Sequence, residues 1–285
     1  RGRVSGRCGF DRHGSIESGQ VAAMALHLHD QQHRSVRSRT TAPRASRSRG
    51  RIAATLVMSL ALVMAWSSGA GAAPGDPSGV VADWRFEERR GASVLTDSSG
   101  FGRNGRIGAA VITEVRLPVG IVHRFSGPDG RAGVTGHVHT VPDHPSLDPA
   151  SGPFGVTVTF RTTTATQNMV QKGQATVSGG FWKIEMSDGR GRCLFRGSTG
   201  DAFVQTTRRL DDGAWHELRC VRSDGRVRLE VDGREEASTV DDAGVIGNTW
   251  ELAIGGKSRC DEVRVSCDLF RGDMNGVRID HGLVK

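Results

Sequence analysis

From residue 80 onward, apolar and polar side chains alternate in one short run after another along the chain. An alternation with a period of two predicts strands that have one face in a core and the other in water. The clearest runs are VADWRFEE, FGVTVTFRT, FWKIEMS and RVRLEVD. The side chains that we expect on their buried faces are Trp84, Phe86, Val156, Val158, Phe160, Trp182, Ile184, Met186, Val227, Leu229 and Val231.

Gly-rich or Asp-Gly turns separate the runs, and no stretch after residue 80 keeps an apolar stripe at helical spacing. Strands joined in this way pack as two antiparallel sheets, because each sheet must bury its apolar face against another layer. The sequence contains no internal repeat, and its length after residue 80 suits a single all-β domain. We therefore predict an all-β fold, a two-sheet antiparallel β-sandwich over residues 80–285.

The formal charge of +7 would suggest a protein that binds nucleic acid or a membrane, but the basic residues are unevenly placed. Residues 1–72 hold 11 Arg, no Lys and 3 acidic residues. The rest of the chain has 27 basic and 28 acidic groups, so its net charge is −1. We therefore expect no nucleic-acid partner.

The first 72 residues predict export. Residues 44–51 are basic, residues 52–66 form an apolar run, and AGA at 70–72 fits a signal-peptidase site. We expect a helical signal peptide over residues 44–72, whose removal gives a secreted, extracellular protein without a membrane span. A retained membrane anchor is the alternative, but the apolar run has 15 residues and a spanning helix needs about 20.

Two further boundaries follow from the composition. Residues 1–23 precede the first methionine, Met24, so we regard them as a doubtful start to a leader that covers residues 1–72. Residues 73–79 are rich in Pro, Gly and Ser, and we expect them to link the leader to the domain.

The cysteine count also fits export. Five Cys are present, and removal of a leader that contains Cys8 would leave four. An even number in an exported domain predicts two disulfides. By themselves the spacings leave three connectivities open among Cys193, Cys220, Cys260 and Cys267.

Several segments carry a family resemblance. They are VVADWRFEE with LTDSSGFGRNGRI, VPDHPSLDP before FGVTVTFRT, LDDGAWHELRCVRSDGRVRLEVDG (210–233), and LAIGG with FRGDMNGVRI. The D-G-x-W-H element, followed by a strand and a V-D-G turn, is fairly specific in this order. Together the segments resemble the laminin G-like, concanavalin A-like lectin and glucanase family. The resemblance is closest to a secreted bacterial group with Cys in RCLFRG, LRCVRS and GGKSRCDEVRVSCDLF, and it implies a jelly roll.

The same resemblance implies two disulfide pairs, Cys193–Cys220 and Cys260–Cys267. The alternation agrees with the first pair, because Cys193 shares a strand face with Phe195 and Cys220 shares one with Leu218. A cystine there would join two inward-facing positions.

Calcium at the rim of the sandwich is a further implication of the resemblance. Asp97, Asn104 and nearby carbonyls offer the oxygen ligands that Ca²⁺ prefers. Relatives often carry Asp in the closing pattern where this chain has Asn275, which lacks the charge that favours the ion. Calcium is therefore the one candidate cofactor, with Asp97, Asn104 and Asn275 as its candidate ligands.

The stretch VRLEVDGREEA places Glu230, Asp232 and Glu235 in the E-x-D-x-x-E order of catalytic carboxylates in β-sandwich glycosidases. A retaining glycosidase needs two carboxyls about 5–5.5 Å apart. Here Gly233 follows Asp232, and Asp-Gly between alternating runs predicts a two-residue hairpin turn with positive φ at both positions. We therefore expect the chain to reverse before Glu235, which would part the three carboxyls and leave a protein without catalytic activity.

Histidines and a glycine motif have ordinary interpretations. GFGRNG (100–105) fits the dinucleotide pattern G-x-G-x-x-G, but it lacks a strand before it and a helix after it, so we interpret it as a loop. His137 and His139 would share a strand face, with His123 and His144 nearby, yet no Cys or carboxylate spacing completes a zinc site.

Two shorter signals also favour structural roles. His216 in AWHEL should point with Leu218 toward the core, where a buried imidazole with hydrogen-bond partners is expected rather than a catalytic base. The tripeptide RGD (271–273) is interpreted as a turn.

Few aromatic residues are left as platforms for a sugar ring. Tyr is absent, and Trp84, Trp182 and Trp250 alternate with core residues. Trp215 should lie on the opposite face from Leu218, and together with Phe181 it is the candidate for stacking against a sugar.

These patterns favour a secreted, non-catalytic module that binds glycan or another cell-surface polymer through rim loops or an outer sheet. A glycoside hydrolase that uses Glu230 and Glu235 is one alternative. A purely structural or adhesive module is the other.

Overall fold

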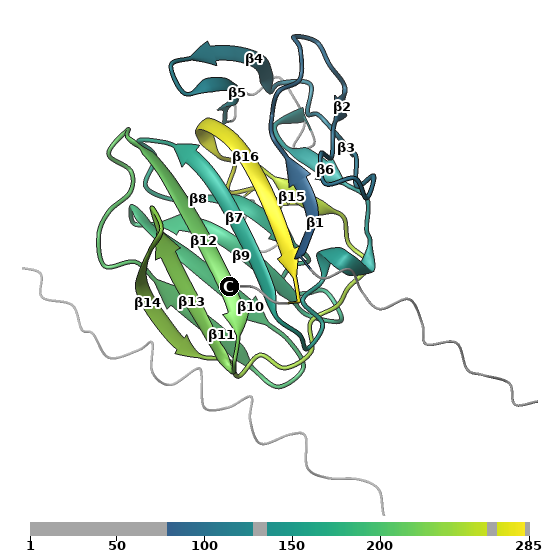
Figure 1. The fold of residues 1–285 in the computed structure, drawn as a ribbon, viewed down its shortest axis with the longest axis vertical. Helices are drawn as coiled ribbons and strands as arrows, with labels where there is room; N and C mark the ends of the chain where they lie inside the picture. The colour runs from purple at the N-terminus through teal and green to yellow at the C-terminus, as the bar shows by residue number, and fades with distance from the viewer. Residues whose placement is uncertain (1–78, 128–135, 261–266, 283–285) are drawn as a thin grey trace, which may run out of the picture. The chain divides into compact units, whose positions relative to one another are not determined.

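The computed structural model describes residues 79–127, 136–260 and 267–282. The expected leader over 1–72 lies outside these residues, as does all but the last residue of the linker. The described chain forms two antiparallel sheets, which confirms the prediction of an all-β sandwich (Figure 1). No helix in the described part of the chain is long and apolar enough to cross a membrane.

Eight strands form the sheet that we call the front sheet, in the order β14-β13-β12-β7-β16-β5-β4, with β1 also paired to β16 (Figure 1). The first half of β16 pairs with β5 and its second half with β1, while β7 runs along its other side. The bounds are β1 Gly79–Trp84, β4 Ile112–Leu117, β5 Gly120–Ser126, β7 Phe154–Arg161, β12 Trp215–Ser223, β13 Arg226–Val231, β14 Arg234–Val240 and β16 Arg271–His281.

Another eight strands form the back sheet, in the order β11-β10-β9-β8-β15-β6-β3-β2. A short 3-10 helix, η2 (Pro145–Leu147), lies on the connection from β6 to β7. The bounds are β2 Val94–Leu95, β3 Gly105–Arg106, β6 His139–Val141, β8 Gln167–Lys172, β9 Phe181–Ser187, β10 Arg190–Arg196, β11 Asp201–Gln205 and β15 Leu252–Ile254.

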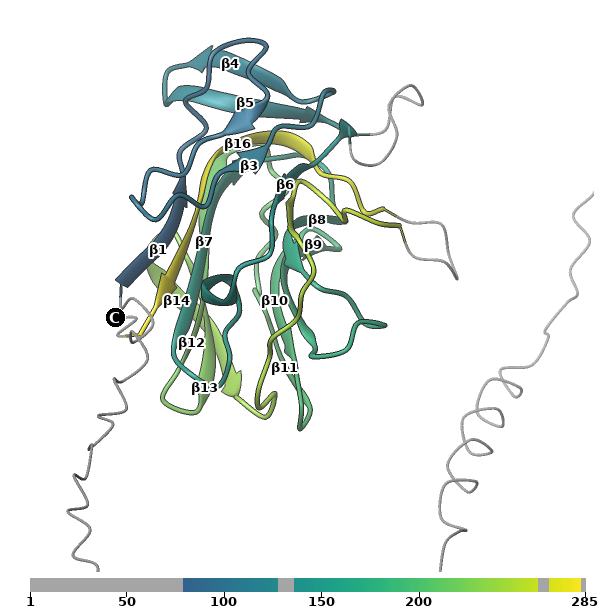
Figure 2. The same ribbon diagram turned by 90° about the vertical axis from the view of Figure 1, so that its right-hand side faces the viewer.

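The hydrophobic core lies between the two sheets, which Figure 2 shows edge-on as two layers. All of the side chains predicted on buried faces are at most 1% exposed. The indole N–H groups of Trp84 and Trp182 donate to backbone carbonyls at 2.8 and 3.0 Å, so these buried polar atoms are satisfied. Trp250 departs from the prediction. It is only half-buried, because it lies in the loop before β15 instead of within a strand.

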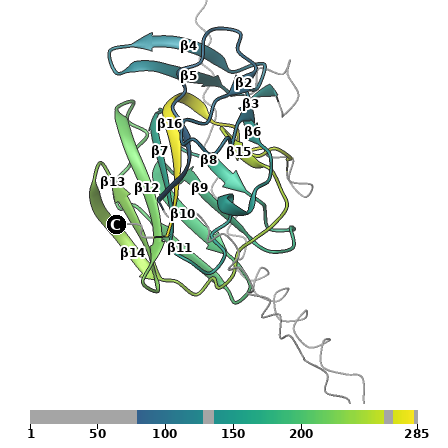
Figure 3. The same cartoon turned by 45° about the vertical axis from the view of Figure 1, so that its right-hand side comes forward.

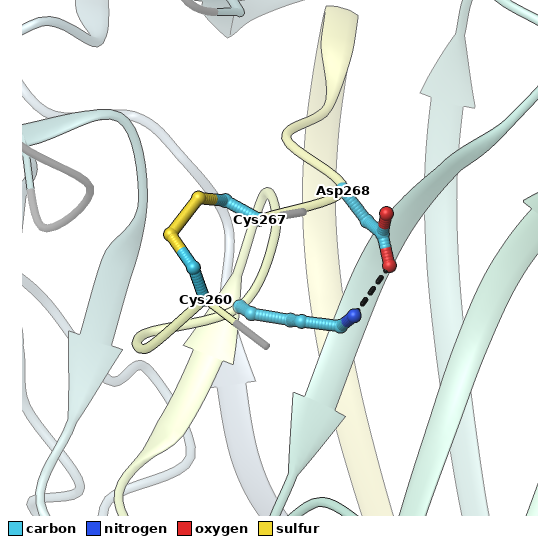
Figure 4. Close-up of a disulfide and its surroundings, with 4 residues drawn as sticks. Cys260, Cys267 and Asp268 are labelled. Atoms are coloured by element: carbon cyan, nitrogen blue, oxygen red, sulfur yellow. Dashed lines mark ion pairs between the residues drawn. A yellow bond between two sulfur atoms is a disulfide. The ribbon is translucent and has the colours of Figure 1, made fainter. Parts of the chain in front are cut away.

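Both implied disulfides are present, Cys193–Cys220 and Cys260–Cys267. Cys193 is on β10 of the back sheet and Cys220 is on β12 of the front sheet, and neither side chain is exposed. The first bond therefore joins the two sheets through the core. The second closes the loop that follows β15 (Figure 4).

Candidate functional site

The three carboxylates of the E-x-D-x-x-E pattern lie on the β13–β14 hairpin. Asp232 (φ 53°) and Gly233 (φ 76°) form its two-residue turn, so the predicted reversal is confirmed. The reversal does not part Glu230 from Glu235, however, because a two-residue turn makes them direct cross-strand partners. Partners on antiparallel strands point to the same face. The expectation that the turn separates the carboxyls of Glu230 and Glu235 was therefore wrong.

Glu230 and Asp232 each have a structural partner. Glu230 forms an ion pair with Arg219 at 3.2 Å, and Asp232 accepts from the backbone N–H of Glu217 at 2.9 Å. Burial disfavours the charge of Asp232, but hydrogen bonds from that N–H, from His216 and from Arg208 together hold its pKa below the ordinary value. A glycosidase acid needs the opposite, a raised pKa.

Asp97, the leading candidate for calcium, already accepts four hydrogen bonds from its own loop and from strand β1. Its Oδ1 accepts from the N–H groups of Asp83 and Ser99, both at 2.9 Å. Its Oδ2 accepts from the N–H of Arg103 at 2.8 Å and from Ser99 Oγ at 2.7 Å. Burial raises the pKa of Asp97, but these donors outweigh burial and lower it. Asn104 Oδ1 in turn accepts from the Asp97 N–H at 2.8 Å.

These residues do not fit a calcium ion. The oxygens of Asp97 and Asn104 that would face a cation accept hydrogen bonds from N–H and O–H donors. Asn275 is on β16, in a small pocket that Glu217 also lines. In residues 79–127, 136–260 and 267–282, no three His, Cys, Asp or Glu side chains converge on a point that could hold a metal.

The GFGRNG segment is the loop that we predicted, with Gly100 and Gly102 at positive φ.

His123 and His139 belong to a linear chain of buried hydrogen bonds instead of a metal site. His139 Nδ1 accepts from the Gly108 N–H at 3.4 Å, so we assign its proton to Nε2, which donates to His123 Nδ1 at 3.0 Å. The proton of His123 is then on Nε2, 3.1 Å from the Glu88 carboxylate. Burial, reinforced by His123, holds the pKa of His139 well below its ordinary value. His137 is buried, at 4% exposed.

His216 and the RGD tripeptide have different outcomes. His216 is 5% exposed and lies between Asp232 (3.0 Å) and Asp212 (3.2 Å), which confirms a buried imidazole with partners. The RGD segment does not form a turn. It opens strand β16, and Asp273 is only 3% exposed, so the tripeptide is not displayed as an exposed adhesion loop.

Asp273 instead belongs to a row of side chains across the front sheet. It is in register with Arg124 on β5 and with Arg161 on β7, and Arg161 is in register with Trp215 on β12. We call these four residues the arginine–tryptophan row. Figure 3 shows β12, β7 and β16 side by side. The row lies on the outer face, because the residues next to Arg161 and Asp273, Phe160 and Met274, point into the core.

The Asp273 carboxylate holds both arginines of the row. It accepts from Arg124 Nε at 2.7 Å and Nη2 at 3.1 Å, and from Arg161 Nη2 at 2.5 Å. Burial disfavours its charge, but the two guanidinium groups outweigh burial and hold the pKa of Asp273 below the ordinary value. The guanidinium carbon of Arg161 also lies 5.4 Å from the centre of the Trp215 ring, a cation–π distance.

A pocket of about 540 Å³ opens beside the row. This volume is within the range of about 300–1,000 Å³ that is usual for small-molecule sites. Three arginines and one aspartate line it, which gives the pocket a net positive charge. The lining residues are Arg124, Phe125, Ser126, Arg161, Thr162, Thr163, Gly213, Arg271, Gly272 and Asp273.

Hydrogen bonds fix the walls of this pocket. Gln167 joins two of them, since its Oε1 accepts from the Arg271 N–H at 2.8 Å and its Nε2 donates to Thr162 Oγ1 at 2.9 Å. The Thr162 hydroxyl donates to the Arg271 carbonyl at 2.6 Å, and the Thr162 carbonyl accepts from the Gly213 N–H at 3.0 Å. The pocket is therefore pre-formed, which lowers the ordering cost of binding.

The two predicted stacking residues do not form one platform. Trp215 is half-buried at the end of the row on the front sheet, whereas Phe181 is on the back sheet. Phe181 is 5% exposed, and the Arg196 guanidinium carbon lies 5.4 Å from its ring centre, so Phe181 does not offer a free face. The arginines of the row were missed in the sequence, because only strand register brings them together.

Residues 160–282 match the family model of the laminin G domain. This part of the chain is laminin G-like. The matched residues include Arg161, Trp215 and Asp273, so most of the arginine–tryptophan row lies within the laminin G match. A search of curated protein sequences returns no match to this chain.

Solved structures share the sandwich at low sequence identity. Domain 4 of AbnA, an extracellular arabinanase from Geobacillus stearothermophilus solved with arabinotriose, is 17% identical, with a TM-score of 0.52 over 73% of this chain and 96% of that chain. A botulinum neurotoxin type C structure, whose title reports interaction with two ganglioside molecules, is 8% identical, with a TM-score of 0.53 over 73% and 49%. The binding domain of Paraclostridial Mosquitocidal Protein 1 is 12% identical, with a TM-score of 0.51 over 72% and 48%. The chain thus spans about half the length of these toxin structures.

Proposed function

We propose that this laminin G-like domain is a secreted, non-catalytic module that binds glycan or another cell-surface polymer on the outer face of its front sheet. The observation that carries the proposal is the pre-formed pocket beside the arginine–tryptophan row. One of its lining residues, Arg161, has its guanidinium carbon 5.4 Å from the centre of the Trp215 ring. Sugars suit such a surface, because an aromatic ring packs against their C–H face while planar Arg and Asp groups bond their hydroxyls.

The charge of the pocket narrows the ligand class. Asp273 neutralises only part of the charge of Arg124, Arg161 and Arg271, so the wall keeps an excess of guanidinium groups. Guanidinium groups bind carboxylates and sulfates with two parallel hydrogen bonds. Saccharides that carry carboxylate or sulfate groups are therefore the ligands that we expect to bind most tightly.

The roles of the carboxylates support binding without catalysis. Asp273 and Asp232 both have lowered pKa values, so neither suits a general acid. Glu230 and Glu235 are register partners, but Glu230 forms an ion pair with Arg219, and neither lines the pocket beside the row. Hydrolysis by Glu230 and Glu235 remains the alternative that an activity assay tests.

The solved structures and the disulfides give independent support. An arabinanase domain was solved with arabinotriose and a neurotoxin is reported to interact with gangliosides, so glycan is a known partner of proteins that share this fold. Two disulfides favour an oxidising location outside the cell, in agreement with the expected signal peptide.

A glycan array with the intact, disulfide-bonded protein tests the proposal. We expect binding to acidic glycans that weakens as NaCl rises to about 0.5 M, because salt screens the guanidinium contacts. Binding to no member of the array would favour the structural or adhesive alternative. Release of reducing sugar from a bound glycan, lost in Glu230→Gln, would establish a hydrolase instead.

A further inference from the structure

A second pocket, of about 420 Å³, lies where β6, β8 and β15 of the back sheet end beside one another. Its lining residues are Asp143, Thr249, Trp250, Glu251, Ser258 and Arg259, and none of them lines the pocket beside the row. We propose that this is a second saccharide site, selective for neutral sugars, so that the domain holds a polysaccharide at two places. The saccharide class rests on the proposed function, whereas the existence and selectivity of the site rest on the contacts below.

Trp250 gives the pocket its aromatic surface. Its ring is half-buried in the loop before β15, and the guanidinium carbon of Arg259 lies 4.7 Å from the ring centre. An arginine that lies over an indole ring repeats the pairing of Arg161 with Trp215 in the arginine–tryptophan row. Trp250 therefore has the half-exposed position that stacking on a sugar requires, while Trp84 and Trp182 are fully buried.

A buried lysine fixes one side of the second pocket. Lys172 has no exposed surface, and its Nζ lies 2.8 Å from Oδ1 of Asp143, 2.8 Å from Oδ1 of Asp148 and 2.6 Å from the Asn248 carbonyl. Asn248 Oδ1 accepts from the Trp250 N–H at 2.9 Å. Because a buried charge needs its partners, these bonds hold Asp143 and Trp250 in place. The Asp143 side chain is still 32% exposed, so it remains accessible to a ligand.

The loop with Ser258 and Arg259 fixes the other side. The Lys257 N–H donates to the Cys267 carbonyl at 3.0 Å, and Lys257 Nζ forms an ion pair with Asp268 at 2.6 Å. Figure 4 shows this ion pair at Asp268 beside the Cys260–Cys267 disulfide. The loop is therefore tied to Cys267 and Asp268 by Lys257 before Arg259, and to Cys267 by the disulfide of Cys260 after it. The second pocket is thus pre-formed, like the first.

The polar groups of the second pocket select neutral sugars. Asp143 and Glu251 accept hydrogen bonds from sugar hydroxyls, Arg259 donates them, and the hydroxyls of Thr249 and Ser258 do either. Two carboxylates against one arginine leave the lining without a positive excess, so a carboxylate or sulfate on the ligand would be repelled. The two pockets thus differ in the sign of their charge, and we expect only the first to prefer acidic glycans.

Fluorine NMR of the full chain labelled with 5-fluorotryptophan tests this second site. The signals are assigned with Trp215→Phe and Trp250→Phe, and the probes are cellotetraose, xylotetraose, mannotetraose and arabinotetraose at up to about 10 mM. We expect at least one of them to shift the Trp250 signal, and Glu251→Gln to weaken that response about tenfold. Phe203→Ala is the matched control, because Phe203 is exposed and stacked by Arg192 at 5.2 Å but lines neither pocket.

Two results would overturn the second site. One is a Trp250 signal that none of the four neutral probes moves, and the other is a shift that persists unchanged in Glu251→Gln. A parallel titration with chondroitin sulfate, followed at Trp215, reports on the first pocket alone. Failure of the proposed function therefore appears as a silent Trp215 signal, and failure of this inference as a silent Trp250 signal.

Discussion

Arg161 Nη2 lies 2.5 Å from Oδ2 of Asp273 on the neighbouring strand, although the two residues are 112 positions apart in the sequence. The same carboxylate accepts two hydrogen bonds from Arg124 on the other side. Asp273 thus sets the positions of both guanidinium groups that the row presents to the pocket. Its removal should affect both the stability of the front sheet and the shape of the site.

Asp273→Asn keeps the size of the side chain but removes its charge. We expect the free energy of unfolding to fall by about 1–3 kcal/mol, less than for a fully buried pair, because the arginine side chains are 43% and 34% exposed. Because the pKa of Asp273 is lowered on folding, this contribution is complete above the unfolded value of about 4 and is lost as the pH falls below it. Urea denaturation of both proteins at neutral and acidic pH measures it. A difference that does not shrink in acid would count against the ion pairs.

The Cys193–Cys220 disulfide should contribute more to stability than Cys260–Cys267. Its cysteines are 27 positions apart against 7, so it restricts the unfolded chain more. We expect Cys193→Ala with Cys220→Ala to lower the free energy of unfolding by about 3–4 kcal/mol, and the other double variant to lower it by about 2 kcal/mol. Guanidinium denaturation compares them, and the reverse order would refute the role of the inter-sheet bond.

Gly233→Ala tests the two-residue turn, Asp232–Gly233, that joins β13 to β14. A Cβ at φ 76° is strained, so we expect a loss of about 1–2 kcal/mol. Gly247→Ala is the matched control, because a Cβ there meets nothing within 4 Å and the backbone is outside the left-handed region. Equal thermal stability of the two variants would show that the turn tolerates a side chain.

The buried histidine chain predicts a loss of stability in weak acid. His139 has a pKa well below the unfolded value of about 6.5, so the unfolded chain binds a proton more readily than the folded protein. Stability is therefore complete above about pH 6.5 and declines as the pH falls below it. We expect His139→Gln to flatten this decline in denaturation curves taken between about pH 7 and 5. A wild-type curve that is already flat in this window would contradict a neutral His139.

The sequence predicted the sandwich because strand alternation is a local property. Val156, Val158, Phe160 and the other inward residues are all in the core. The Asp232–Gly233 turn was also local and correct, but its consequence for Glu230 and Glu235 depended on register, and that consequence was missed. The arginine–tryptophan row depends on register alone, since β5, β7, β12 and β16 are distant in sequence. The family resemblance implied calcium at Asp97, but the oxygens of this carboxylate accept hydrogen bonds from the backbone N–H groups of Asp83 and Arg103.

The affinity of Trp215→Ala for the tightest-binding glycan, measured by isothermal titration beside Phe203→Ala, tests the proposed site most directly. Both variants remove a partly exposed aromatic ring that an arginine stacks on, but only Trp215 lies next to the first pocket. We predict that Trp215→Ala weakens binding at least about tenfold and that Phe203→Ala leaves it unchanged. Equal affinities of the two variants and the wild type would contradict a binding site on the outer face of the front sheet.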